Sequence, residues 1–127
     1  MGWQMGFEIP VDVDYFEHPK TVLLVGLLGV EADIYPLRLW AWCSKCAKNG
    51  RVKGGRPAIE SACKWNGVPG KLHRALIKVG FLKGDGESVH DWMEHIGRAI
   101  LLYEKKKKKQ RDKYAAGILP EETGRIP

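Results

Sequence analysis

The sequence of 127 residues has no long hydrophobic run. Its longest apolar stretch, Val22 to Leu28 with Gly26 inside it, is far short of the roughly 20 residues that a membrane span needs. The N-terminus has no basic start followed by an apolar stretch, so it does not resemble a signal peptide. Since 44% of the residues are hydrophobic and five are Trp, we expect a folded, soluble, cytoplasmic protein.

The patterns of common catalytic sites are also missing. There is no Gly-rich phosphate loop, no Ser or Cys nucleophile beside a placed base, and no pair of carboxylates at a suitable spacing. We therefore expect neither enzyme activity nor a cofactor.

Cysteine is scarce, with only the pair Cys43-x-x-Cys46 and a lone Cys63. A structural zinc site needs four ligands, and no second close pair is present. Because the pair lies deep in a helical pattern, core packing is favoured over the alternatives of a zinc site and a redox pair. The histidines that would have to complete a zinc site are His73, His90 and His95.

The segment His90–His95 contains two histidine–carboxylate pairs at i, i+4 spacing, which a metal site could use. A structural role is the simpler interpretation. In it, Asp91 caps a helix and Trp92 packs under the preceding hairpin. We expect no metal here.

Positive charge is almost absent from the first part of the chain. Residues 1–37 hold six acids and one base, Lys20, whereas residues 38–127 hold twenty bases and nine acids. Such a one-sided distribution suggests a polyanion as partner, and the alternative is a basic solvated surface.

The apolar pattern and the turn residues predict five helices and one hairpin. The first helix, with Pro19 in its first turn and Gly29 as its stop, is apolar on nearly all sides and is expected to be central and buried. A hairpin is expected around Gly84-Asp85-Gly86. The expected helices cover residues 20–28, about 33–48, 58–65, 69–79 and 92–103 or beyond.

The order of helix, turn, basic helix and hairpin is typical of a winged helix-turn-helix. In the helix of residues 69–79, one apolar stripe is formed by Leu72, Ala75, Leu76 and Val79, and the basic residues fall on other faces. The predicted fold is mainly α with a small β-hairpin. It has an N-terminal arm (residues 1–13), a winged-helix domain (14–103), and a basic, largely flexible tail (104–127) that begins as an extended helix.

Basic residues of this unit are the candidates for binding DNA, through phosphates in a salt-sensitive way. Readout of base edges would fall to Lys71, His73 or Arg74, and the single arginine argues against sharp sequence specificity. The alternative is that these are ordinary solvated positions. The candidate DNA-binding residues are Arg56, Lys64, Lys71, His73, Arg74, Lys78 and Lys83, with Lys105, Lys106 and Lys107 of the tail.

Three segments resemble the N-terminal domain family of phage replisome organisers. Residues 11–20 (VDVDYFEHPK) are similar to the entry of that domain, and residues 36–40 (PLRLW) to its second helix. Residues 78–82 (KVGFL) and 89–95 (VHDWMEH) resemble the passage from helix to wing and the segment after it. The resemblance covers roughly residues 8–98.

The resemblance implies a winged helix related to DnaD-type replication initiation proteins, with residues 71–79 as recognition helix and 83–88 as wing. Such proteins bind double-stranded DNA at an origin, self-associate, and help to recruit the replicative helicase or its loader.

Two other roles are open. In the first, the domain is an oligomerisation or protein-interaction module of the replication machinery. An aromatic arm would then pack on a sister chain through Trp3, Phe7, Tyr15 and Phe16. RNA binding is the weaker one, because no exposed stacking aromatics on a sheet are evident.

Overall fold

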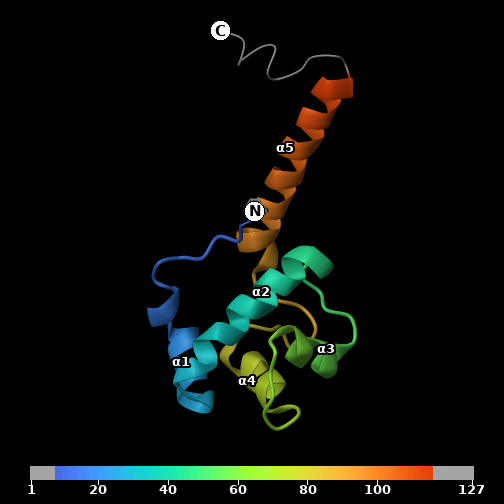
Figure 1. Ribbon diagram of the computed structural model, residues 1–127. Helices are drawn as coiled ribbons and strands as arrows, with labels where there is room; N and C mark the ends of the chain where they lie inside the picture. Colours follow the sequence, from blue (N-terminus) through green and yellow to red (C-terminus); the bar gives the residue numbers. More distant parts are fainter. Residues whose placement is uncertain (1–7, 116–127) are drawn as a thin grey trace, which may run out of the picture.

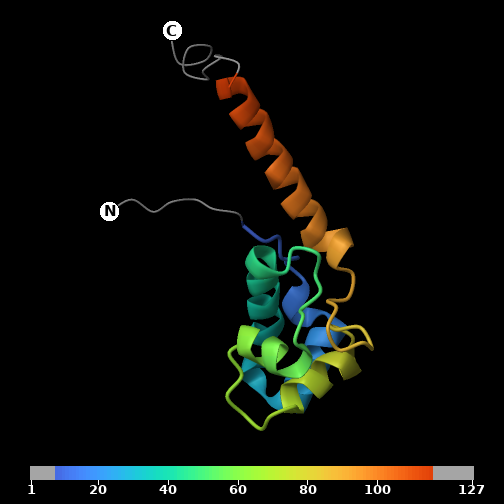
Figure 2. The ribbon, with the colours of Figure 1, turned by 90° about the vertical axis from the view of Figure 1, so that its right-hand side faces the viewer.

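Helices dominate the fold, as the sequence predicts. The computed structural model describes residues 8–115. The fold has five α-helices, of which the first four pack around a small core and the last extends away from the body (Figures 1 and 2). The α-helices are α1 (Pro19–Leu28), α2 (Ile34–Cys46), α3 (Gly55–Ala62), α4 (Lys71–Val79) and α5 (Arg98–Ala115), with the 3-10 turns η1 (Tyr15–Glu17) and η2 (Val30–Asp33) and the π-helical turn η3 (Met93–Gly97).

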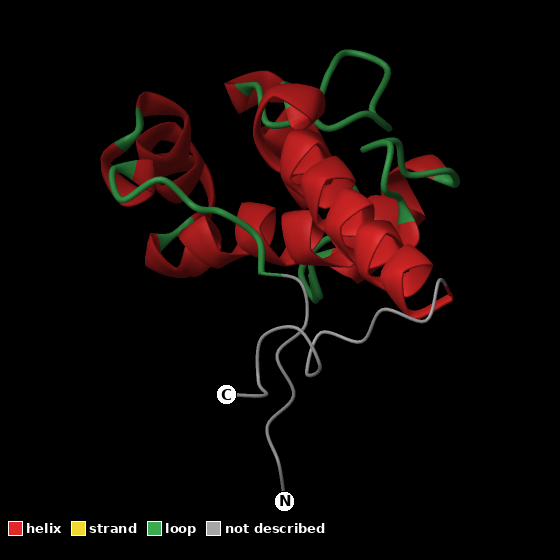
Figure 3. Cartoon of the chain, turned by 90° about the horizontal axis from the view of Figure 1, so that it is seen from above, coloured by secondary structure: helices red, strands yellow, loops and turns green. Residues whose placement is uncertain are grey.

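The expected hairpin does not appear as a pair of strands. Figure 3 shows helices and loops only, and residues 8–115 contain no β-strand. Two isolated antiparallel bridges, Arg51 with Ser88 and Leu82 with Val89, join three segments of the chain. Pairing stays short because Asp91 follows with a left-handed backbone (φ +56°), which turns the chain towards η3.

Helix α1 has the predicted bounds but not the predicted burial. Its N-terminus is capped by the His18 ring, which accepts a hydrogen bond from the backbone N–H of Lys20, and Gly29 (φ +112°) ends it. Only Thr21 and Leu24 are buried. The expectation of a helix covered on all sides is therefore wrong, because α4, η1 and η2 pack against one face only.

The core lies where the first four helices meet. Its fully buried members come from each of these helices and from the segment after α2. They include Leu24, Leu39, Val52, Ile59, Leu72 and Leu76.

Helix α5 is anchored at its base only. Trp92, Ile96 and Ile100 are buried, and the Trp92 indole donates a hydrogen bond of 2.7 Å to the Lys48 carbonyl. Glu104 forms an ion pair with Lys48. Beyond this point the helix runs away from the body (Figures 1 and 2). The basic segment is thus helical as far as Ala115, and the rest of the predicted tail lies outside the described residues.

Asp91 does not cap this last helix as expected. Its carboxylate lies 3.0 Å from Nδ1 of His90, and no side chain caps the N-terminus of η3. None of the helices within residues 8–115 is long and apolar enough to cross a bilayer.

Candidate nucleic-acid interface

The position of α4 depends on a buried carboxylate of α3, Glu60, which is only 6% exposed. Its two oxygens accept hydrogen bonds of 2.9 and 3.0 Å from the backbone N–H of Gly70, and one accepts a third of 3.1 Å from that of His73. The Arg56 guanidinium donates to it at 3.0 Å. These N–H groups begin α4 and would otherwise lack partners, so Glu60 joins the two helices.

The environment of Glu60 keeps it charged. Burial alone would raise its pKa, but the N–H groups of Gly70 and His73 and the Arg56 guanidinium outweigh burial and lower the pKa. The role of Glu60 was not predicted from the sequence. The only signal was an acid directly after the inward-facing Ile59, in a helix with no local capping motif that would point to Gly70.

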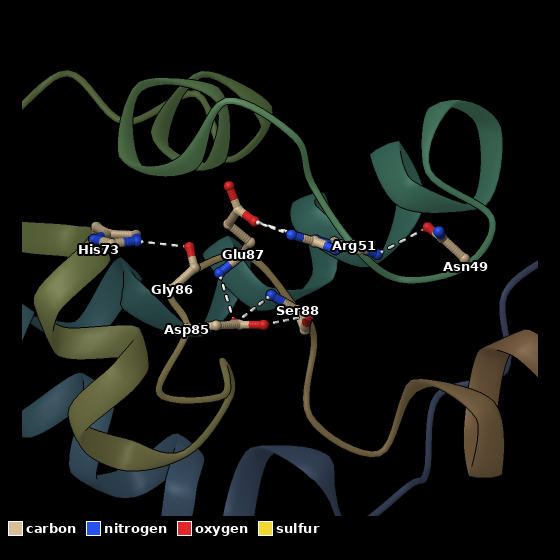
Figure 4. Close-up of polar contacts among 7 residues, drawn as sticks. All are labelled: Asn49, Arg51, His73, Asp85, Gly86, Glu87 and Ser88. Carbon is tan, nitrogen blue, oxygen red and sulfur yellow. Dashed lines mark hydrogen bonds and ion pairs between the residues drawn. The ribbon is translucent and has the colours of Figure 1, made fainter.

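The turn of residues 83–88 is held by side chains within it and by side chains of neighbouring segments (Figure 4). Asp85 accepts hydrogen bonds from the N–H groups of Glu87 and Ser88, both at 2.9 Å, and from the Ser88 hydroxyl at 2.7 Å. These bonds lower the pKa of Asp85 to about 2. Arg51 pairs with Glu87 at 3.0 Å, and the Asn49 side chain accepts a hydrogen bond from the N–H of Arg51.

His73 connects α4 to this turn (Figure 4). Its Nε2 atom donates a hydrogen bond of 2.8 Å to the Gly86 carbonyl. Gly86 has φ +71°, and a Cβ at that position would lie 2.9 Å from the same nitrogen. Glu60 and His73 therefore hold α3, α4 and the turn as one braced unit.

Three of the predicted cations are brought together on α4. At about 100° per residue, Lys71, Arg74 and Lys78 fall within an arc of about 60°. All three are exposed, and none forms an ion pair with another of the described residues. The guanidinium of Arg74 folds back over the start of the helix, where its Nη1 would lie 2.7 Å from a Cβ on Gly70.

The other predicted DNA-binding residues differ in their exposure, their partners and their place in the molecule. Lys64, at the end of α3, and Lys83, at the start of the turn, are exposed. Arg56 is tied to Glu60, and His73 is half-buried against Gly86. Lys105, Lys106 and Lys107 are exposed on α5, at the end of the molecule opposite to α4 (Figure 1), so the structure does not gather them with the α4 cations.

The predicted self-association residues are split between core and surface. Tyr15 is buried, packs edge-on against Trp40 with ring centroids 5.5 Å apart, and donates a hydrogen bond of 2.7 Å to the Asp33 carbonyl. Burial accordingly raises its pKa, and its ring has no surface to offer a sister chain. Phe16 is exposed, while Trp3 and Phe7 lie outside the described residues.

The cysteines separate in the same way. Cys43 and Cys63 are fully buried, and burial raises the pKa of both thiols to about 12. Cys46 is exposed. Within residues 8–115, no group of three or more His, Cys, Asp or Glu side chains is arranged to hold a metal ion.

Comparisons with known proteins add no assignment. The chain matches no protein family, no curated protein and no solved structure.

Proposed function

We propose that this is a DNA-binding winged-helix protein of phage or prophage DNA replication, of the replisome-organiser type. Helix α4 is the recognition helix, and residues 83–88 are the wing. The observation that carries the proposal is the arc of exposed cations on α4, Lys71, Arg74 and Lys78, none of which pairs with a carboxylate of the described residues. The bridges from Leu82 to Val89 and from Ser88 to Arg51 support a minimal wing, since they join the segments that its three short strands would occupy.

The dimensions of α4 suit a DNA groove. An α-helix with its side chains is about 10–12 Å in diameter and fits a major groove about 12 Å wide, and the nine residues of α4 give it a length of about 13 Å. The cations of the α4 arc contact DNA phosphates, and Lys83 of the wing contacts the neighbouring phosphates of the DNA backbone. His73 serves to hold the wing against α4 and does not read bases itself.

Backbone groups contribute little to this binding mode. A helix N-terminus often binds phosphate, but at the start of α4 the N–H groups of Gly70 and His73 already donate to Glu60, and that of Lys71 donates to the Val68 carbonyl. Binding therefore depends on side-chain cations and is salt-sensitive and weakly sequence-specific, with Arg74 as the only guanidinium on the arc.

Fluorescence anisotropy with duplex DNA across a salt series tests this proposal. The variant Lys71→Glu/Arg74→Glu/Lys78→Glu should bind much more weakly. Because each lost phosphate contact removes about 0.9 from the slope of log K against log salt, that slope should fall by about 2.7. Unchanged affinity and slope would remove α4 from the interface.

A matched pair of single variants controls for net charge. Lys78 and Lys45 are exposed lysines in the last turns of α4 and α2. Lys78→Glu should weaken binding about tenfold, which is one ordinary charge-assisted contact. Lys45→Glu should have a clearly smaller effect, and equal losses would indicate a diffuse basic surface.

A second candidate function is an oligomerisation or protein-interaction module of the replication machinery. The observation that favours it is the apolar outer face of α1, where Val22 and Leu23 are 55% and 58% exposed. Light scattering combined with the anisotropy titrations separates the two roles. A self-associating protein with no DNA affinity would leave only the second.

A further inference from the structure

The outward face of α1 is apolar along its whole length. The buried positions of this helix are Thr21 and Leu24, whereas Val22, Leu23 and Leu27 are 43–58% exposed. Single exposed apolar side chains are ordinary, but a contiguous patch usually marks an interaction site. The exposed apolar side chains of this region are Val13, Phe16, Val22, Leu23, Leu27, Val30 and Ile34.

The shape of the α1 face suits another helix. At about 100° per residue, Gly26 lies between Val22 and Leu23 around the helix. A Cβ built on Gly26 has no neighbour within 4 Å, so the centre of the face is open. Small residues at such a position let a second backbone approach closely.

The surroundings of this face are acidic. Glu17 precedes α1 and Glu31 follows it, both exposed, and Asp12 and Asp14 of the preceding segment are exposed as well. The only base of residues 8–37 is turned inward, since Lys20 Nζ donates to the Gly80 carbonyl at 3.1 Å. The face is thus apolar in the middle and negative at its ends.

Helix α5 has the complementary character. Its packed side carries the buried Ile100, and its opposite side begins with Leu101 and Leu102, which are 53% and 59% exposed. One and two turns further along, Lys105, Lys106 and Lys109 continue the same side. Five consecutive lysines repel one another, so this helix gains from an acidic surface.

From this complementarity we infer that α5 of a second copy of the chain lies on the α1 face. Leu101 and Leu102 cover the apolar centre, and the lysines, which all follow them along α5, meet the acids at one end of the face. The helix cannot reach the α1 face of its own chain, since it leads away from the body at the end opposite to α1 (Figures 1 and 2). Two α1 faces packed together would instead bring acid against acid.

Reciprocal exchange of α5 gives a closed two-fold dimer, in which each copy provides one helix and one face. A stable interface buries about 800 Å² per partner. The seven apolar side chains of this region are 37–90% exposed, and with the α5 side chains they would bury an area on that order. This inference deepens the interaction role and is independent of DNA binding by α4.

Two charge-reversed variants test the inference. Their masses are measured by light scattering, alone and mixed, in the absence of DNA. One variant, Glu17→Lys/Glu31→Lys, makes the α1 face basic, and the other, Lys105→Glu/Lys106→Glu/Lys109→Glu, makes α5 acidic. The unmodified protein should have twice the chain mass of 14.3 kDa. Each variant alone should be monomeric, whereas an equimolar mixture should recover the dimer, because both of its α1–α5 pairs are again of opposite charge.

Three outcomes would overturn the inference: an unmodified protein that stays monomeric over the whole concentration range, variants that remain dimeric alone, or a mixture that stays monomeric. Helical circular dichroism confirms that each variant is folded. Leu23→Asp should also abolish the dimer, whereas the matched control Val68→Asp, at a 63% exposed valine in the α3–α4 loop, should not.

The same samples keep the two proposals apart. The α4 triple variant should remain dimeric while losing DNA affinity. The Glu17→Lys/Glu31→Lys variant should become monomeric while still binding DNA.

Discussion

Helices α1 and α4 are of similar length and each buries one stripe of side chains, yet they present opposite surfaces. In α4, Leu72, Ala75 and Leu76 face the core and lysine and arginine occupy the outside. In α1, Leu24 faces the core while Val22 and Leu23, equally apolar, face outward. An amphipathic pattern thus specifies both sides of a helix, whereas an apolar helix leaves the choice to its neighbours.

The two regions also differ in which charge is neutralised inside the chain. Around α4 the acids are engaged, since Glu60 holds the helix start, Asp85 caps the turn and Glu87 pairs with Arg51. Around α1 it is the base, Lys20, that is engaged. Each region is left with a surface of one sign, which is why one suits a polyanion and the other a basic helix.

The largest expected effect compares two adjacent leucines of α1. Leu24→Ala should lower the free energy of unfolding by about 3 kcal/mol, because Leu24 is fully buried and its removal leaves a cavity. Leu23→Ala should change it by less than about 0.5 kcal/mol in dilute, monomeric protein. Denaturant unfolding measures both. Similar losses would mean that the outer face of α1 is covered within the chain.

Removing the carboxylate that joins α3 to α4 should have the next largest effect. Glu60→Ala should cost about 2–3 kcal/mol, because it leaves the buried N–H of Gly70 without an acceptor. Glu94→Gln, at an exposed acid, is the control and should be nearly neutral. An equally small effect of Glu60→Ala would show that Glu60 does not join α3 to α4.

The lowered pKa of Glu60 also predicts how the stability of the protein changes with pH. The pKa of Glu60 is lowered in the folded state from its ordinary 4.5, so its contribution is complete above that value and is lost as the pH falls through the folded pKa. The variant Glu60→Gln should be less stable at neutral pH and should lose less stability on acidification. Asp85 contributes in the same range to both proteins, so the difference between them isolates Glu60.

Alanine substitutions at two glycines of the turn should differ in their cost in stability, by less than the changes above. Gly86→Ala should cost about 1–2 kcal/mol, because φ is +71° and the new Cβ would press on His73. Gly84→Ala should be tolerated, since a Cβ there has no neighbour within 4 Å. Thermal unfolding of both variants compares them. A neutral Gly86→Ala would show that α4 and the turn are not tightly coupled.

Much of the helical arrangement could be predicted because its signals are local. Pro19 and Gly29 delimit α1, and the stripe from Leu72 to Val79 predicts α4 and its buried side. The outward side of α1 could not be predicted, since its burial depends on which elements cover it. The prediction of a hairpin with paired strands is wrong. Its turn residues are favourable, but the pairing beyond them ends at Asp91 and leaves only isolated bridges.

The candidate site was predictable in its cations but not in what positions them. Lys71, Arg74 and Lys78 are visible as basic residues off the apolar stripe. The roles of Glu60 and His73 depend on partners that are ten and thirteen residues away, at Gly70 and Gly86. No local motif marks either partnership, so both required the tertiary structure.

Alkylation of the three thiols is the smallest perturbation, and it compares buried with exposed side chains without changing stability. Cys46 is exposed, whereas Cys43 and Cys63 are fully buried with pKa values of about 12. Only the thiolate reacts with alkylating reagents. Brief treatment of the native protein with iodoacetamide should therefore add one adduct, at Cys46, by mass spectrometry. The variant Cys46→Ser should add none until denaturant is present, and rapid labelling of Cys43 in native protein would contradict the packing of α2 against α3.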